Sequence, residues 1–126
     1  MIRLTINGLE VSVEDGMTVL EAAEFLGFPI PTLCHMDGLS PYGACRLCVV
    51  EIGEGPRAKL VSSCSYPAEE GLIVRTASTR VLRARRMIIE LLLASCPQSK
   101  IIQDLAASLG VTRQRFRQEH EDCILC

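Results

Sequence analysis

Four cysteines between residues 34 and 64 constrain what this chain can fold into more than any other feature. Cys34, Cys45, Cys48 and Cys64 have the spacing C-x10-C-x2-C-x15-C. A [2Fe–2S] cluster is held by four thiolates, and plant-type ferredoxins supply them with the shorter first gap of C-x4-C-x2-C…C. The spacing here therefore predicts a [2Fe–2S] site with all four cysteines as ligands.

A zinc site and disulfides are the alternatives to a cluster. Structural zinc prefers two closely spaced pairs of ligands, and this segment has one such pair. Disulfides belong to oxidising compartments, whereas the first residues, Met-Ile-Arg-Leu-Thr-Ile, alternate and form no apolar signal core. The longest apolar run, residues 87–94, is short and contains Glu90, so we expect no membrane span. Because nothing in the first residues suggests export, we expect a cytoplasmic chain.

The elements expected in the first part of the chain come in the order of a β-grasp sheet. Residues 2–6 and 9–13 alternate around Asn7-Gly8, a pair suited to a type I′ turn, which predicts a β-hairpin. Thr18 and Glu21 have the spacing of a capping box, so a helix is predicted to start there and to end at Gly27. Further strands are expected over residues 49–52, 58–61 and 72–76. The predicted fold class is α+β.

The second part of the chain changes to helical periodicity. From Ser78 the apolar residues recur at steps of three and four, which predicts a helix of about four turns and then a second helix that Gly110 ends. We therefore predict a [2Fe–2S] β-grasp domain over residues 1–77 and a small helical appendage over residues 78–126. Residues 1–77 carry five Lys or Arg and ten Asp or Glu, a net charge of −5, and residues 78–126 carry eight and five, a net charge of +3. This split favours protein docking.

The cysteines and their flanks together resemble a known family. Pro31-Thr-Leu-Cys34-His and Ser40-Pro-Tyr-Gly-Ala-Cys45-Arg-Leu-Cys48-Val-Val-Glu51 resemble the N-terminal [2Fe–2S] domain of the large iron–sulfur subunit of respiratory complex I. The same domain resembles the start of iron-only hydrogenases and of NAD-linked formate dehydrogenase subunits. The likeness covers roughly residues 1–95.

This resemblance implies an electron-transfer module with no catalytic residues of its own. Its [2Fe–2S] cluster would carry single electrons in a larger oxidoreductase linked to NAD(P)H and flavin. The expected partners are a flavoprotein subunit that oxidises NAD(P)H, a larger iron–sulfur enzyme subunit, or both. By analogy with plant-type ferredoxins, Cys34 and Cys45 would bind one iron, and Cys48 and Cys64 would bind the other.

The chain departs from this family after the long helix. In the complex I subunits and hydrogenases, a helix that ends like Glu90-Leu-Leu-Leu-Ala-Ser precedes a histidine and three closely spaced cysteines that bind a [4Fe–4S] cluster. Here Cys96 takes the place of the histidine, and residues 97–102 contain no cysteine. We therefore expect that this second cluster is absent and that Cys96 is a semi-buried thiol.

Two further cysteines end the sequence, in Glu121-Asp-Cys123-Ile-Leu-Cys126. Ferredoxin [4Fe–4S] sites have the run C-x2-C-x2-C-x3-C, and the sequence stops at the second cysteine of such a run. We expect the parent protein to continue into a ferredoxin-like domain in which Cys123 and Cys126 are the first [4Fe–4S] ligands. The alternatives are a surface dithiol and a zinc site made by Cys96, His120, Cys123 and Cys126.

Residues 101–117 offer a rival function, because their pattern resembles that of a DNA-binding helix-turn-helix. Ala106 would be the small residue and Gly110 the turn glycine, and Val111 and Phe116 would be the core side chains. The recognition helix would carry Arg113, Arg115 and Arg117. A redox-sensing DNA-binding regulator is therefore the alternative function. Three acidic residues follow directly, however, and the whole chain is acidic, so nucleic acid is the less favoured partner.

Four arginines gather in the first half of the expected long helix, namely Arg80, Arg83, Arg85 and Arg86. We interpret them as a solvated face, in which Arg86 pairs with Glu90 one helical turn further on. The functional alternative is a docking face for an acidic partner subunit.

Overall fold

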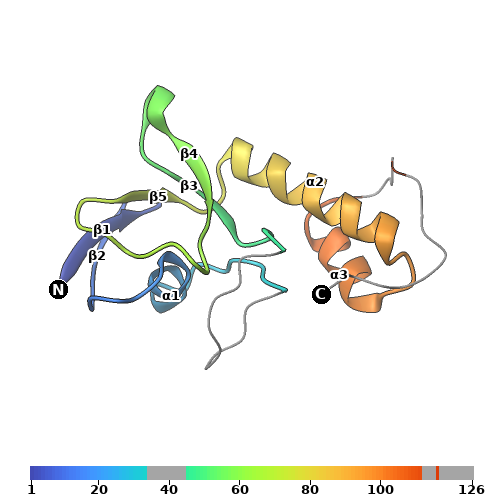
Figure 1. Ribbon diagram of the computed structural model, residues 1–126, viewed down its shortest axis with the longest axis horizontal. Helices are drawn as coiled ribbons and strands as arrows, with labels where there is room; N and C mark the ends of the chain where they lie inside the picture. The colour runs from blue at the N-terminus through green and yellow to red at the C-terminus, as the bar shows by residue number, and fades with distance from the viewer. Residues whose placement is uncertain (34–44, 112–115, 117–126) are drawn as a thin grey trace. The chain divides into compact units, whose positions relative to one another are not determined.

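The structure is a computed structural model that describes residues 1–33, 45–111 and 116. The chain divides into two compact units, Met1–Val81 and Leu82–Cys126. Figure 1 shows the order of the helices and strands along the chain. The predicted domain boundary at residue 77 stays a prediction.

A five-stranded mixed sheet forms the framework of the first unit (Figure 1). Its strands are β1 (Ile2–Ile6), β2 (Leu9–Val13), β3 (Val49–Ile52), β4 (Lys59–Ser62) and β5 (Ile73–Arg75), with the short 3-10 helix η1 (Gly55–Arg57) between β3 and β4. The strand order is β2-β1-β5-β3-β4, in which β1 and β5 are parallel and the other neighbours antiparallel. The sheet and the helix packed on it confirm the predicted α+β class with a β-grasp arrangement.

The hairpin of β1 and β2 forms as predicted, and its turn is tied to the rest of the sheet. Asn7 and Gly8 have φ angles of 52° and 85°, which a type I′ turn requires. The side-chain oxygen of Asn7 accepts from the Thr76 N–H at 2.9 Å, and its side-chain nitrogen donates to the Thr76 hydroxyl at 2.8 Å. The turn therefore holds the segment that follows β5.

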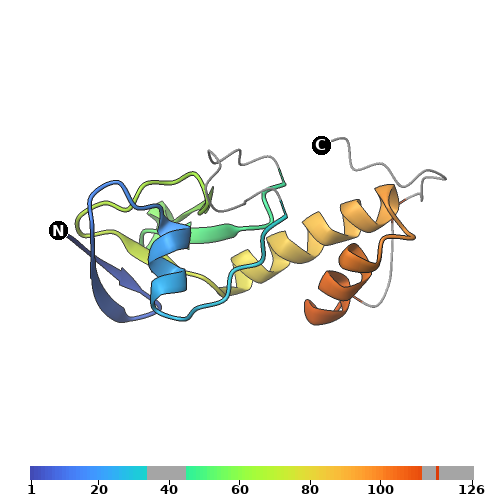
Figure 2. The same ribbon diagram turned by 90° about the horizontal axis from the view of Figure 1, so that it is seen from below.

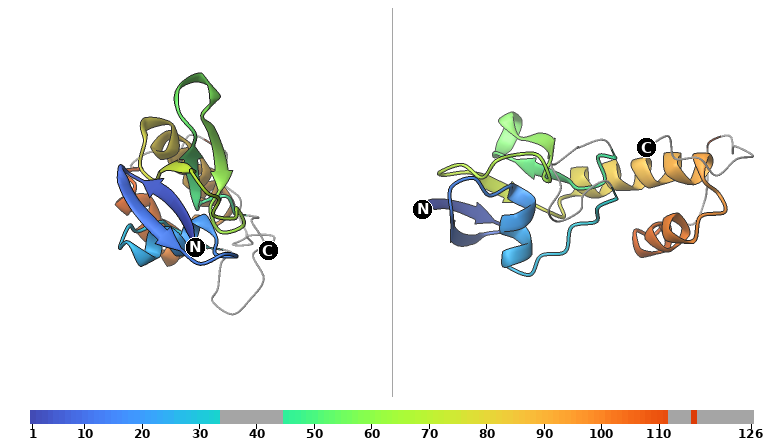
Figure 3. Two further views of the ribbon diagram at one scale, coloured as in Figure 1. Left: turned by 90° about the vertical axis from the view of Figure 1, so that its left-hand side faces the viewer. Right: turned by 60° about the horizontal axis from the view of Figure 1, so that its bottom comes forward.

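Helix α1 (Val19–Phe25) begins with the predicted capping box. The Thr18 hydroxyl accepts from the Glu21 N–H at 3.2 Å, and the Thr18 N–H donates to the Glu21 carboxylate at 2.8 Å. Gly27, with a φ of 83°, follows the end of the helix as expected. Figure 2 shows α1 against one face of the sheet, and the views in Figure 3 agree. The core between them is built from Leu4, Ile6, Val11, Val13, Val19, Leu20, Ala22, Ala23, Val50, Ile52 and Val74.

Two long-range connections fix the start of α1 near the end of β4. The Leu20 N–H donates to the Ser63 carbonyl at 3.0 Å, and the Val19 N–H donates to the Tyr66 carbonyl at 2.9 Å. These bonds satisfy two of the amides that a helix start leaves without intrahelical partners. The helix therefore supports the segment that contains Cys64.

Among the described residues of the helical part are two helices, α2 (Thr79–Ser95) and α3 (Lys100–Ser108). Ser99 caps α3 by accepting from the Ile102 N–H, and Gly110 follows its end with a φ of 73°. Ile102 and Ala106 are the buried residues of α3. Among the described residues, none of the helices is both long and apolar enough to span a bilayer.

The arginines of α2 do not form one solvated face. Arg85 and Glu90 are buried, at 3% and 5% exposure. Arg80 bonds to the buried carboxylate of Glu51 at 3.0 Å. Arg86 donates from Nε to the Leu109 carbonyl at 3.0 Å, and its expected pair with Glu90 stays a prediction. The solvated interpretation is therefore wrong for Arg85, which is buried, whereas Arg80 and Arg86 are exposed and each also donates a hydrogen bond within the protein.

Candidate metal centre

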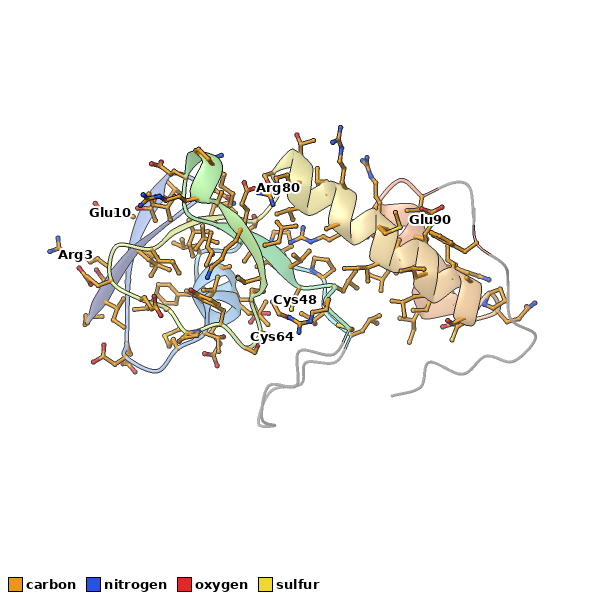
Figure 4. The ribbon with its side chains drawn as sticks, turned by 45° about the horizontal axis from the view of Figure 1, so that its top comes forward. Arg3, Glu10, Cys48, Cys64, Arg80 and Glu90 are labelled. Carbon is orange, nitrogen blue, oxygen red and sulfur yellow. The ribbon has the colours of Figure 1, made fainter. Side chains whose placement is uncertain are left out.

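The sheet brings two of the predicted ligands to the same place. Cys48 directly precedes β3, and Cys64 follows two residues after the end of β4. Because β3 and β4 are antiparallel with Val49 opposite Ser62, the start of one strand adjoins the end of the other. Figure 4 shows Cys48 and Cys64 together at this end of the sheet. Both are fully buried and are thiols rather than disulfides.

Two serines between these cysteines make close contacts to Cys48. The Ser62 hydroxyl lies 3.1 Å from the sulfur of Cys48 and 3.8 Å from the sulfur of Cys64. The Ser63 hydroxyl donates to the backbone carbonyl of Cys48 at 2.6 Å, and the Ser63 N–H donates to the same carbonyl at 3.3 Å. The end of β4 thus contacts both the backbone and the sulfur of Cys48.

The surroundings of Cys48 favour its thiolate. Burial alone raises the pKa of the Cys48 thiol, but hydrogen bonds from the Ser62 hydroxyl and from the backbone of Cys64 outweigh it, and the net effect lowers the pKa below 9.0. A metal-bound cysteine must be deprotonated. The hydrogen bonds that lower this pKa therefore prepare Cys48 to be a ligand.

The segment from Cys45 to Cys48 is a tight turn. Arg46 has a φ of 60°, a left-handed conformation that is uncommon for a residue with a side chain and costs roughly 1–2 kcal/mol. The Arg46 carbonyl accepts from the Val49 N–H at 3.2 Å, and Leu47 is fully buried beside it. The buried Leu47 and the following strand hold Arg46 in this conformation. Cys45, three residues before Cys48, is half-buried.

The remaining predicted ligands are placed less completely. Cys34 lies outside the described residues, as do His120, Cys123 and Cys126. Within the described residues, no three His, Cys, Asp or Glu side chains meet in an arrangement that could hold a metal ion. Cys96 is buried directly after α2 in the second unit, at 1% exposure, rather than semi-buried as expected. Cys45 is therefore not brought into one group with Cys48 and Cys64.

Sequence reasoning missed Ser62, although a weak signal for it exists. Ser62 lies two residues before Cys64, and side chains two apart on a strand share a face, which is the weak signal. The proximity of Ser62 to Cys48 depends on the register of β3 with β4, and no sequence pattern specifies that register.

Comparison with known proteins defines the class of this chain. Residues 1–79 match the family described as "2Fe-2S iron-sulfur cluster binding domain". The chain belongs to this family, and its cofactor is a [2Fe–2S] cluster. The predicted resemblance is thereby confirmed.

The relatives are subunits of oxidoreductases. The chain is 38% identical over 92% of its length to the mitochondrial NADH-ubiquinone oxidoreductase 78 kDa subunit of Candida albicans, covering 16% of that protein. It is 43% identical over 92% of its length to the NADP-reducing hydrogenase subunit HndD of Solidesulfovibrio fructosivorans, covering 22% of that protein. A crystal structure of an NAD+-reducing [NiFe]-hydrogenase superposes with a TM-score of 0.82 at 33% identity, over 95% of this chain and 53% of the other.

These comparisons also bear on the extent of the chain and on the rival function. The chain spans less than a quarter of the length of the curated relatives cited above. Nothing in the comparisons supports a DNA-binding regulator. The arginines assigned to a recognition helix, Arg113, Arg115 and Arg117, lie outside the described residues.

The described residues fit the cluster of this family by the chemistry of their donors. Thiolates are the ligands of iron–sulfur clusters. Cys48 and Cys64 present two sulfurs at one end of the sheet, with a hydroxyl placed against both. When bound, a [2Fe–2S] cluster supplies a centre that gains and loses one electron at a time.

Proposed function

We propose that this chain is a one-electron transfer module, in which Cys34, Cys45, Cys48 and Cys64 hold the [2Fe–2S] cluster. The observation that carries the proposal is the position of Cys48 and Cys64, whose sulfurs lie 3.1 Å and 3.8 Å from one buried hydroxyl. Two cysteines that are separated by fifteen intervening residues are brought to one polar group here by the pairing of β3 with β4. Membership of the cluster-binding family supports the same assignment.

The protein's own residues have two roles in this function. The paired ends of β3 and β4 hold the turns that contain Cys48 and Cys64 next to each other, which limits the movement of these sulfurs when the charge of the site changes. Complete burial of Leu47, Cys48 and Cys64 keeps water away from this side of the site. Exposure to water and hydrogen bonds to sulfur are two of the properties that set a cluster's reduction potential.

The module would act within a larger NAD(P)H-linked oxidoreductase. The relatives include an NADH-ubiquinone oxidoreductase subunit, an NADP-reducing hydrogenase subunit and an NADPH-Fe(3+) oxidoreductase subunit. The partners we propose are a flavoprotein subunit that oxidises NAD(P)H and a larger iron–sulfur subunit. The net charge of −5 over residues 1–77 would suit a docking surface with basic groups on the partner.

Anaerobic preparation of the protein tests the cluster and its ligands. The protein should contain about two iron and two labile sulfide ions, and dithionite should produce an EPR signal of a reduced [2Fe–2S] centre. Cys45→Ser and Cys48→Ser should each abolish or strongly alter this signal, whereas Cys96→Ala, which removes a cysteine of the second unit, should not. Unchanged spectra in both serine variants would show that the ligands are assigned wrongly.

Native complexes test the role in electron transfer. NAD(P)H should reduce the cluster in a complex purified from the source cells and should leave it oxidised in the isolated chain, which lacks the flavoprotein partner. Rapid reduction of the isolated chain by NAD(P)H would contradict the proposal that a flavoprotein partner supplies the electrons.

A further inference from the structure

The Ser62 side chain contacts both of the predicted ligands that the sheet brings together. It is the last residue of β4 and is 5% exposed. Its hydroxyl lies 3.1 Å from the sulfur of Cys48 and 3.8 Å from that of Cys64. The neighbouring Ser63 has a different role, because its hydroxyl donates to the carbonyl of Cys48 at 2.6 Å.

The direction of the Ser62 hydrogen bond follows from the state of the sulfur. When both groups carry a proton, either the hydroxyl or the thiol can be the donor. A cysteine that binds iron is a thiolate and has no proton to donate. In the loaded protein the Ser62 hydroxyl must therefore be the donor, and its single proton goes to the nearer sulfur, that of Cys48.

We infer that Ser62 sets the reduction potential of the cluster by donating a hydrogen bond to the Cys48 thiolate. This inference rests on the proposed function, because it requires Cys48 to be a ligand. Reduction adds one negative charge, part of which falls on the ligand sulfurs. A hydroxyl donor stabilises the more negative, reduced state more than the oxidised state, so Ser62 raises the potential.

Burial makes this contact effective. A hydrogen bond acts more strongly where the local dielectric constant is low, and Ser62, Cys48 and Cys64 are all buried. The backbone position of Ser62 is also fixed. Its residue pairs with Val49 across β3 and β4, and its carbonyl accepts from the Tyr66 N–H at 3.1 Å. The hydroxyl is therefore held beside the sulfur.

Redox titration of the loaded protein followed by EPR tests the inference. Ser62→Ala should bind iron and sulfide as the wild type does but have a lower midpoint potential. At a fixed potential the ratio of reduced to oxidised protein should fall by about three- to tenfold, and a tenfold fall in a one-electron couple corresponds to about 59 mV. Ser62→Thr keeps the hydroxyl and should restore most of the wild-type potential.

A second readout reports on the sulfur directly. The iron–sulfur stretching bands in the resonance Raman spectrum should shift between H2O and D2O in the wild type, because the hydroxyl proton exchanges. Part of this isotope shift should be lost in Ser62→Ala and should be present in Ser62→Thr. A structural role for Ser62 alone would change stability and would leave the isotope shift unaltered.

Ser63→Ala is the matched control, since it removes the adjacent buried hydroxyl, which donates at 2.6 Å to the carbonyl of Cys48. It should change the potential and the isotope shift by less than Ser62→Ala does. An equal fall in potential in Ser63→Ala, or an unchanged potential in a loaded Ser62→Ala, would overturn the role of Ser62 and leave the cluster assignment intact. A wild-type protein that binds no cluster would overturn both.

Discussion

The guanidinium of Arg80, in the first turn of α2, lies 3.0 Å from the carboxylate of Glu51 on strand β3. The same nitrogen donates to the carbonyl of Ala58 at 3.1 Å, just before β4. Figure 4 shows Arg80 in this position at the start of α2. Glu51 has 6% of its side chain exposed and Arg80 has 55%. One arginine therefore connects the start of the helix with Glu51 on β3 and with the residue before β4. Glu51 follows Cys48 by three residues in the sequence.

The first prediction concerns this connection. Arg80→Ala leaves a buried carboxylate without its counter-ion, and the free energy of unfolding should fall by about 1–2 kcal/mol. This loss of stability should be smaller than for a fully buried ion pair, because the Arg80 side chain is partly exposed and water screens its charge. Anaerobic urea unfolding, followed by circular dichroism, measures it.

The control for this prediction is Arg83→Ala, which removes an exposed arginine from the same helix and should change stability by less than about 0.5 kcal/mol. Glu51→Gln should reduce the cost of Arg80→Ala in the double variant, since no buried charge then remains. Strictly additive effects of the two substitutions would contradict the ion pair.

The second prediction concerns the hairpin turn. Asn7→Gly keeps the positive φ angle but removes both side-chain bonds to Thr76, and should destabilise the first unit by about 1–2 kcal/mol. Asn7→Ala removes the same bonds and adds backbone strain, so it should destabilise the first unit by about another 1 kcal/mol. Equal stability of the two variants would show that the left-handed conformation contributes little.

The features that sequence reasoning predicted well are local. The Asn7-Gly8 turn and the capping box of Thr18 and Glu21 each depend on residues that are at most three positions apart, and both are present. Strand boundaries shifted by one residue, with β4 over Lys59–Ser62 and β5 over Ile73–Arg75, because hydrogen bonding to neighbours defines a strand end.

The features that could not be predicted depend on contacts between distant segments. The charges of Arg85 and Glu90 predict surface residues, yet both are buried in the folded unit. Glu51 alternates within β3 like a solvent-facing residue and is covered by Arg80. The spacing of the four cysteines predicts them as ligands, and that assignment stays a prediction. The hydroxyl that lies between Cys48 and Cys64 depends on strand register.

The third prediction concerns the start of α1. Thr18→Ala removes the hydroxyl that accepts from the Glu21 N–H and should lower the free energy of unfolding by about 1 kcal/mol. Thr18→Ser keeps an acceptor and should be close to the wild type. Because α1 supports the segment of Cys64 through the Leu20–Ser63 bond, Thr18→Ala should also lose iron faster to a chelator. An unchanged rate of iron loss would show that the start of α1 does not affect how firmly the cluster is held.

The last prediction concerns Cys96, which is 1% exposed in the second unit and follows α2 directly. Its N–H donates to the Leu92 carbonyl at 2.8 Å, and its own carbonyl accepts from the Ser99 N–H at 3.2 Å, so the residue joins the two helices through its backbone. A small buried side chain in this position contributes by packing. Cys96→Ala should therefore leave the iron content, the sulfide content and the EPR spectrum unchanged, while unfolding of the helical unit becomes easier by about 1 kcal/mol. Cys96→Ser should destabilise the helical unit more than Cys96→Ala does, because a hydroxyl is more costly to bury than a thiol. Loss of iron from Cys96→Ala, confined to a second spectral species, would instead make Cys96 a ligand of a further metal centre.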